Sequence, residues 1–142
     1  MHRVQDVLRA KGDSVYSVRP TDTVLHALGV MAEHEVGAVL VLDDEKLVGI
    51  LTERDYARKV VLAGRSSKDS QIKDVMTDRV ACVTPDRAID ECLAMMTDKR
   101  VRHLPVLEHK TVVGLVSIGD LVKATIADQQ FTIEQLQAYI AG

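Results

Sequence analysis

The sequence predicts a mixed α/β (α+β) fold made of two β-α-β-β-α repeats that pack sheet to sheet with pseudo-twofold symmetry. Three observations lead to this prediction. The chain matches itself at an offset of 65 residues, and its strand-like segments are continuously apolar. The composition is 46% hydrophobic but only 3% aromatic, so the core must be aliphatic. One repeat of about 50 residues buries too little surface to fold alone, whereas two together form a viable core.

The internal repeat is the strongest of these observations. Residues 18–58 align with 83–123 without a gap. The matched pairs include Pro20/Pro85, Leu28/Leu93, Met31/Met96, Gly49/Gly114 and Asp55/Asp120. Residues 5–8 align with 73–76 at an offset of 68, which makes the loop before the first proline three residues longer. We therefore expect a first repeat over 1–71 with its lead-in and linker, a second repeat over 72–127, and a C-terminal helix over 128–142.

The elements of the first repeat follow from local patterns. Residues 15–18 form a short apolar segment that ends before Pro20, and the hydroxyl and carboxyl groups of 21–23 can cap a helix that runs to residue 34. Continuous apolar runs predict strands over 38–42 and 47–51, joined by an acidic turn. A second helix is expected over 55–62, ended by Gly64.

The second repeat is predicted to follow the same order, with strands over 80–83, 103–107 and 111–116 and helices over 86–99 and 118–127. Strands without polar alternation are buried on both faces, so helices must cover the sheets. In the tail, Ile133, Leu136 and Ile140 recur at helical spacing and predict a final amphipathic helix. That helix packs either on its own module or on a partner chain.

Composition narrows the function. Eighteen basic against 21 acidic residues give a net charge of −3, which argues against a nucleic-acid binder. There is no apolar run long enough to span a membrane and no apolar signal peptide, so we expect a cytoplasmic protein without a membrane partner. Cys82 and Cys92 are interpreted as buried thiols, with no metal site. The five histidines lack the spacing of a joint site, so no catalytic residue is assigned and an enzyme is not expected.

One motif occurs in both repeats, as Gly49–Asp55 and Gly114–Asp120, each with the pattern Gly-x-x-Thr/Ser-x-x-Asp. A hydroxyl at a helix N-terminus can meet a phosphate, and an aspartate three residues later can accept from both hydroxyls of a ribose. The alternative is a helix-capping box, which we favour for a single copy. Two copies at matched positions favour a binding function, although duplication also copies caps.

With these motifs, the prolines that end the first strands, and the segment 101–106, the chain resembles a tandem pair of CBS (cystathionine beta-synthase) domains, also called a Bateman module. The resemblance covers residues 4–127. The stretch 52–59 with 64–68 is similar to free-standing bacterial members. The resemblance implies a module that binds adenosine ligands in clefts between the two repeats, with AMP favoured and NAD(H) or another adenylate as alternatives.

The resemblance also implies the site residues. Cleft one would hold Thr52, Arg54, Asp55 and Arg58 with Val80, Cys82, Arg102, His103 and Pro105. Cleft two would hold Ser117 and Asp120 with Tyr16, Ser17, Gly37 and Ala38. In each cleft the aspartate would take the ribose, the hydroxyl the α-phosphate, and the strand residues the adenine.

The two clefts are expected to differ. Cleft one is richer in basic side chains, because Gly119 in the second repeat replaces Arg54 and removes a phosphate partner. For Arg58, a phosphate contact and a merely exposed position are about equally supported. For His103, a ligand contact and a core position are about equally supported. Lys59 is interpreted as solvent-exposed. The few basic residues favour a monophosphate or a dinucleotide over ATP.

Two functions remain open. The first is a sensor of energy or redox state that acts on a separate, unidentified protein partner. The second is an assembly module with vestigial clefts and no ligand-dependent role. The resemblance implies a homodimer paired through the helices over 23–34, 55–63, 88–99 and 119–127.

Overall fold

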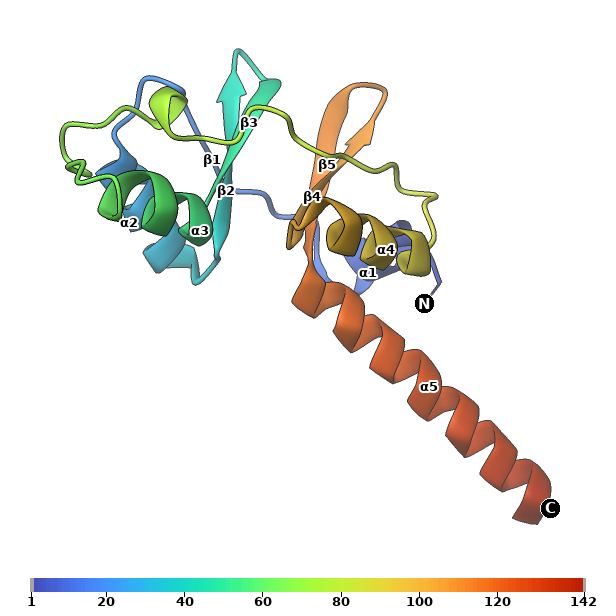
Figure 1. Ribbon diagram of the computed structural model, residues 1–142. Coiled ribbons are helices and arrows are strands. Elements are labelled where there is room, and N and C mark those ends of the chain that lie inside the picture. The colour runs from blue at the N-terminus through green and yellow to red at the C-terminus, as the bar shows by residue number, and fades with distance from the viewer. Residues whose placement is uncertain (1, 142) are drawn as a thin grey trace. The chain divides into compact units, whose positions relative to one another are not determined.

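The computed structural model describes residues 2–141, which fold into two compact units (Figure 1). One unit, called here the first unit, spans Val15–Ala81. The second unit combines the described parts of Met1–Ser14 and Cys82–Gly142. Each unit contains one copy of the repeat, so the mixed α and β composition expected from the sequence is confirmed. The packing of one sheet against the other stays a prediction.

The first unit is built on a three-stranded sheet in the order β1-β2-β3. Strand β1 (Ser17–Val18) runs parallel to β2 (Ala38–Asp43), which pairs antiparallel with β3 (Lys46–Thr52). The helical segments of the unit are α2 (Val24–His34), α3 (Glu53–Asp55), the π-helical turn η1 (Tyr56–Val61) and the 3₁₀ turn η2 (Ile72–Asp74). Helix α2 buries Val24, Ala27 and Met31, so its apolar stripe contributes to the core as the spacing predicts.

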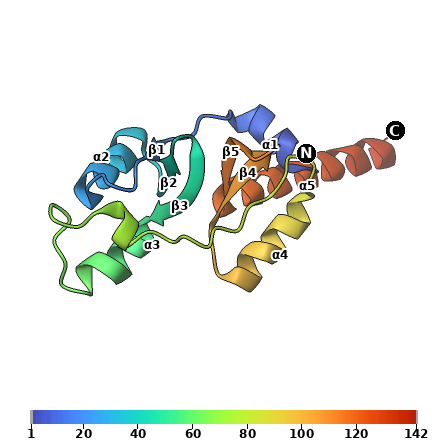
Figure 2. The same cartoon turned by 90° about the horizontal axis from the view of Figure 1, so that it is seen from above.

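The second unit has a two-stranded antiparallel sheet of β4 (His103–Glu108) and β5 (Thr111–Ser117). Its helices are α1 (Val4–Lys11), α4 (Ile89–Lys99) and α5 (Ile118–Ala141). Viewed from above, α1, α4 and the first turns of α5 surround the β4–β5 sheet (Figure 2). No helix within residues 2–141 has the length and hydropathy needed to cross a bilayer.

The repeat extends to backbone detail. Both hairpins turn through two residues with positive φ, Asp44 and Glu45 in the first unit and His109 and Lys110 in the second. Two positive φ values in succession are the signature of the tight hairpin turn that matches strand twist. Each pair of φ values recurs at the 65-residue offset, so the structure supports the alignment independently of residue identity.

The lead-in segments cross between the sequence repeats. Leu8 of α1 packs over Gly114 of β5, and Met76, which follows η2, packs over Gly49 of β3. A Cβ atom would come within 2.5 Å of Met76 at Gly49 and within 2.7 Å of Leu8 at Gly114, so this close packing depends on glycine at both positions. Because residues 5–8 and 73–76 align with each other, the same contact occurs in both units. Each compact unit therefore includes the lead-in segment that precedes the other repeat in sequence. The predicted boundaries at 71 and 127 instead divide the chain by consecutive repeats.

One predicted strand is absent. Residues 80–83 contribute only an isolated parallel bridge between Val83 and Val106. In the first unit, the amide of Leu40 donates to the carbonyl of Tyr16 at 3.0 Å and so holds β1. The residue that corresponds to Leu40 is Pro105, which has no N–H to donate. This strand prediction was wrong because it ignored the partner strand.

Two helix predictions also need correction. The helix expected over 55–62 begins at Glu53 and widens into η1, in which the amide of Leu62 donates to the carbonyl of Ala57, five residues earlier. The segments 118–127 and 128–142 were expected as separate helices, but α5 is continuous from Ile118 to Ala141. Residues 120–141 contain no glycine or proline, so nothing local ends the helix between them.

Candidate functional site

The first copy of the motif lies where β3 ends and α3 begins. Thr52 caps α3, because its hydroxyl accepts from the amide of Asp55 at 3.1 Å. In return, Oδ2 of Asp55 accepts from the amide of Thr52 at 3.1 Å. The capping box considered from the sequence is therefore formed. In this box the Thr52 hydroxyl is the acceptor, so the box does not use its proton.

Asp55 is buried, with 8% of its surface exposed, and it is the one buried charged residue among residues 2–141. Its Oδ1 accepts from the hydroxyl of Thr77 at 3.0 Å and lies 3.2 Å from Nζ of Lys59. The interpretation of Lys59 as simply solvent-exposed is thus incomplete, because it forms an ion pair one helical turn from Asp55. The buried carboxylate has partners on both oxygens, as a buried charge requires.

The second copy lies at the start of α5. The hydroxyl of Ser117 accepts from the amide of Asp120 at 3.1 Å, and Oδ2 of Asp120 accepts from the amide of Ser117 at 2.8 Å. The same Oδ2 takes a hydrogen bond from Nζ of Lys11 at 2.6 Å. Lys11 also donates to the carbonyl of Leu115 at 2.8 Å, which fixes it on α5 and β5. Burial raises the pKa of Asp120, but the bonds from Lys11 and Ser117 outweigh burial and hold that pKa below its usual range.

The strand residues of the predicted clefts lie beside these motifs. In the first unit Ala38 pairs with Thr52, and the amide of Glu53 donates to the carbonyl of Gly37 at 3.1 Å. In the second unit His103 pairs with Ser117, and the amide of Ile118 donates to the carbonyl of Arg102 at 2.9 Å. At one end of its sheet, the first unit brings together the motif of cleft one and the strand residues predicted for cleft two. The second unit brings together the motif of cleft two and the strand residues predicted for cleft one.

The structure places the remaining predicted residues as follows. Arg54, Arg58, Ser17 and Arg102 are exposed, Tyr16, Val80, Cys82 and His103 are half-buried, and Pro105 is buried. Cys92 is buried as predicted, whereas Cys82 is only half-buried, although this partial burial still raises the pKa of its thiol. The two halves of each predicted cleft belong to different units, so their meeting stays a prediction. No cluster of His, Cys, Asp or Glu within residues 2–141 is suited to a metal ion.

Sequence reasoning missed three residues that touch the predicted site. Lys11 and Thr77 bind the two aspartates from the lead-in segments, and the ring of His34 stacks on Tyr16 with centroids 3.7 Å apart. The alignment of 5–8 with 73–76 was the available signal for Lys11 and Thr77, since it marked both segments as part of the repeat. Nothing in the spacing indicated His34.

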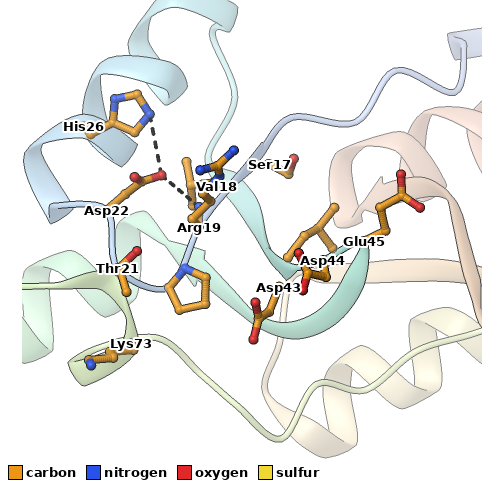
Figure 3. A pocket seen from close by; sticks show the side chains of 12 residues that line it. Ser17, Val18, Arg19, Thr21, Asp22, His26, Asp43, Asp44, Glu45 and Lys73 are labelled. Carbon is orange, nitrogen blue, oxygen red and sulfur yellow. Dashed lines mark hydrogen bonds and ion pairs between the residues drawn. The ribbon is translucent and has the colours of Figure 1, made fainter.

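A pocket of about 880 Å³ lies at the opposite end of the first unit's sheet, at the β2–β3 turn (Figure 3). There Asp22 accepts from the amide of Arg19 at 2.8 Å and lies 3.9 Å from His26. Asp43, Asp44 and Glu45 make its rim acidic. The pocket shares only Ser17 with the predicted site residues, so it is separate from the two motifs.

Comparison with known proteins identifies the family. The family model described as CBS domain matches residues 4–62 and 72–127. A solved structure of a protein with CBS domains from Burkholderia ambifaria is 52% identical, covers 92% of this chain and 98% of its own, and superposes with a TM-score of 0.87. The mitochondrial CBS domain-containing protein CBSX3 of Arabidopsis thaliana is 39% identical over 98% of this chain and 72% of its own length.

A further relative shows the same module inside a larger protein. The inosine-5'-monophosphate dehydrogenase of Methanocaldococcus jannaschii is 35% identical over 87% of this chain, but the match covers 25% of that enzyme. The matched region is thus a minor part of it. This chain belongs to the CBS-domain family and carries two copies of the domain, as its motifs suggested.

Proposed function

We propose that this CBS-domain pair is a regulatory module that binds an adenosine nucleotide and modulates a separate protein partner. CBS-domain pairs are commonly regulatory, and many bind adenosine ligands. The preferred ligand in this proposal is AMP, with NAD(H) as the alternative, and the module reports energy or redox state. A cytoplasmic location and a homodimer paired through the repeat helices complete the proposal, which includes no catalytic step.

The observation that carries the proposal is the pair of carboxylates at two equivalent helix starts. Asp55 and Asp120 each stand three residues after a hydroxyl residue, beside the strand ends at Ala38 and His103. A ribose diol needs an acceptor at that place, and the neighbouring hydroxyl with the helix N-terminus suits a phosphate. Burying the Asp55 carboxylate costs desolvation free energy, and a cap does not require it, because an exposed aspartate can cap a helix as well.

The ligand must compete with protein groups at both sites. A diol at Asp55 has to replace the bonds from Thr77 and Lys59, whereas at Asp120 it has to share or replace the bond from Lys11. Such exchange is how a ligand changes a protein: it shifts the equilibrium by its differential affinity for the two arrangements. The lead-in segments that carry Thr77 and Lys11 are thus suited to transmit occupancy.

The test is a thermal-shift panel with AMP, ADP, ATP, NAD⁺, NADH and S-adenosylmethionine, on protein shown by its absorbance to be free of nucleotide. A ligand at 100 times its Kd adds about 2.7 kcal/mol, which raises the Tm by several degrees. Asp55→Asn and Asp120→Asn should each reduce the shift. Asp22→Asn is the matched control, because Asp22 also bonds a backbone amide at a helix start but lies at the far end of the sheet.

One observation favours the assembly module instead. Both aspartates already complete capping boxes, so structure alone gives them a role. If no adenosine ligand shifts the Tm of the nucleotide-free protein, the sensor proposal fails and the assembly function remains.

A further inference from the structure

Helix α5 extends well past the unit that it belongs to. Of its 24 residues only Leu121 and Ala124 are buried, and every residue from 129 to 141 is exposed. Figures 1 and 2 show its C-terminal half running beyond α1, α4 and the β4–β5 sheet of the same unit. The first turns anchor the helix, and the rest has no cover within the described unit.

Exposed large apolar side chains recur along α5 in a regular pattern. Val122, Ile126, Ile133, Leu136 and Ile140 are between 44% and 82% exposed. Their spacing, with Gln129 in the one gap, is 4, 3, 4, 3 and 4 residues. This is the alternation of a heptad repeat, with Ile126, Ile133 and Ile140 at one core position (a) and the other three at the second (d).

We propose that α5 pairs with the α5 of a second copy of this chain as a parallel, two-stranded coiled coil over residues 122–140. Isoleucine occupies all three a positions and leucine one d position, Leu136, and isoleucine at a with leucine at d favours a two-stranded parallel coil. The seam is shorter than three full heptads, but its N-terminal turns are already held on the unit through Leu121 and Ala124. That anchoring lowers the entropy cost that limits short isolated helices.

Charge favours a second copy over other occupants. The positions that flank the seam are Lys123, Thr125, Gln130, Thr132, Gln137 and Tyr139. Only Lys123 among them is charged, so two identical helices meet with little repulsion. A helix that lies on an anionic membrane carries Lys or Arg along its polar face, and residues 124–142 contain neither.

The polar layer at Gln129 sets the direction. In a parallel pair, d residues face d residues, so the two Gln129 amides meet and can donate and accept between themselves. In an antiparallel pair, a residues face d residues, and Gln129 would oppose an isoleucine. An amide opposite an apolar side chain loses its hydrogen bonds with water without replacement.

The test uses single cysteines in the full chain, in a Cys82→Ser, Cys92→Ala background whose fold is checked by circular dichroism. Ile133→Cys lies on the seam, and Phe131→Cys is the matched control on the opposite side of the helix, at 62% exposure against 47%. A disulfide needs Cα atoms within about 7 Å, which only a seam position in parallel register provides. Ile133→Cys should cross-link at least tenfold faster than Phe131→Cys under mild oxidant at micromolar protein.

Adding Leu136→Asp, which places two like charges in one layer, should abolish the Ile133→Cys cross-link while the unit stays folded. Ile133→Cys and Phe131→Cys both lie beyond residue 127, where the helices expected to pair the homodimer end, so the difference between their rates reports on the tail itself. Equal rates at Ile133→Cys and Phe131→Cys, or a cross-link that survives Leu136→Asp, would overturn the proposal. So would a mixed cross-link between Val122→Cys and Ile140→Cys chains without any at Ile133→Cys, because it reports an antiparallel pair.

Discussion

The two copies of the Thr/Ser-x-x-Asp motif share a capping box but hold their aspartates with different partners. The Asp55 side chain is 10% exposed and has a hydroxyl and an ammonium partner, Thr77 and Lys59. The Asp120 side chain is 25% exposed and has Lys11, which comes from 109 residues earlier in the chain. Duplication therefore preserved the part of the motif that is local in sequence, while the surrounding contacts diverged.

The difference bears on ligand binding. The sequence predicts that cleft one is richer in basic residues than cleft two and leaves open which of them is occupied. In the structure Asp55 is the more deeply buried and the more fully bonded of the two carboxylates, so a ligand has more to displace there. Asp120 is the more exposed of the two, so a ligand reaches it more easily. Substitutions at these contacts test whether the two copies differ as the contacts imply.

The largest contrast is expected from removing each carboxylate. Asp55→Ala should lower the free energy of unfolding by about 2–3 kcal/mol, since it removes a helix cap and leaves the partly buried Thr77 hydroxyl and Thr52 amide without their acceptor. Asp120→Ala should cost about 1 kcal/mol, the usual value of a cap in a more exposed place. Urea denaturation followed by circular dichroism measures both. Equal losses would mean that burial of Asp55 does not distinguish the two copies.

A smaller contrast is expected at the two glycines under the lead-in segments. In Gly49→Ala the new Cβ would lie 2.5 Å from Sδ of Met76 and 3.0 Å from the carbonyl oxygen of Thr77. In Gly114→Ala its three nearest atoms would all belong to the side chain of Leu8, the closest at 2.7 Å. The Thr77 carbonyl is held by the amide of Ile50 at 2.9 Å, whereas the end of a leucine can shift.

Gly49→Ala should therefore cost about 1–2 kcal/mol and Gly114→Ala less than about 1 kcal/mol, as overpacking costs depend on how far neighbours can move. Unfolding in urea provides both values. Met76→Ala should recover part of the loss in Gly49→Ala. If Gly114→Ala proves the more damaging, the rigid contact at Thr77 is not what separates the two units.

These contacts also show where sequence reasoning reaches its limit. The hairpin strands were predicted to within one residue, because continuous apolar runs and an acidic turn are local signals. The prediction of a strand at 80–83 was wrong because formation of that strand depends on Pro105, which lies in another strand. Lys11 was missed because its partner is Asp120. Both errors concern a pairing between residues far apart in sequence, and no local pattern contains such information. The repeat, in contrast, was sufficient to predict the positions of the motifs and the family.

The smallest effect is expected from Lys11→Met, which removes the ammonium from Asp120 and keeps most of the apolar stem. The pKa of Asp120 should rise toward its ordinary value, as a carboxyl titration by NMR would show. Because that pKa is lowered in the folded state, Asp120 stabilises the protein above its unfolded pKa of about 3.9, and this contribution is lost as the pH falls through the folded value. Lys11→Met should thus cost about 0.5 kcal/mol at pH 7, a figure reduced because the Lys11 side chain is 34% exposed, and less at pH 3. Lys46→Met, at the exposed β2–β3 turn, is the control and should change stability at neither pH. An equal loss at both pH values would assign the role of Lys11 to packing and its bond to Leu115, and the two copies would then differ only in how deeply their aspartates are buried.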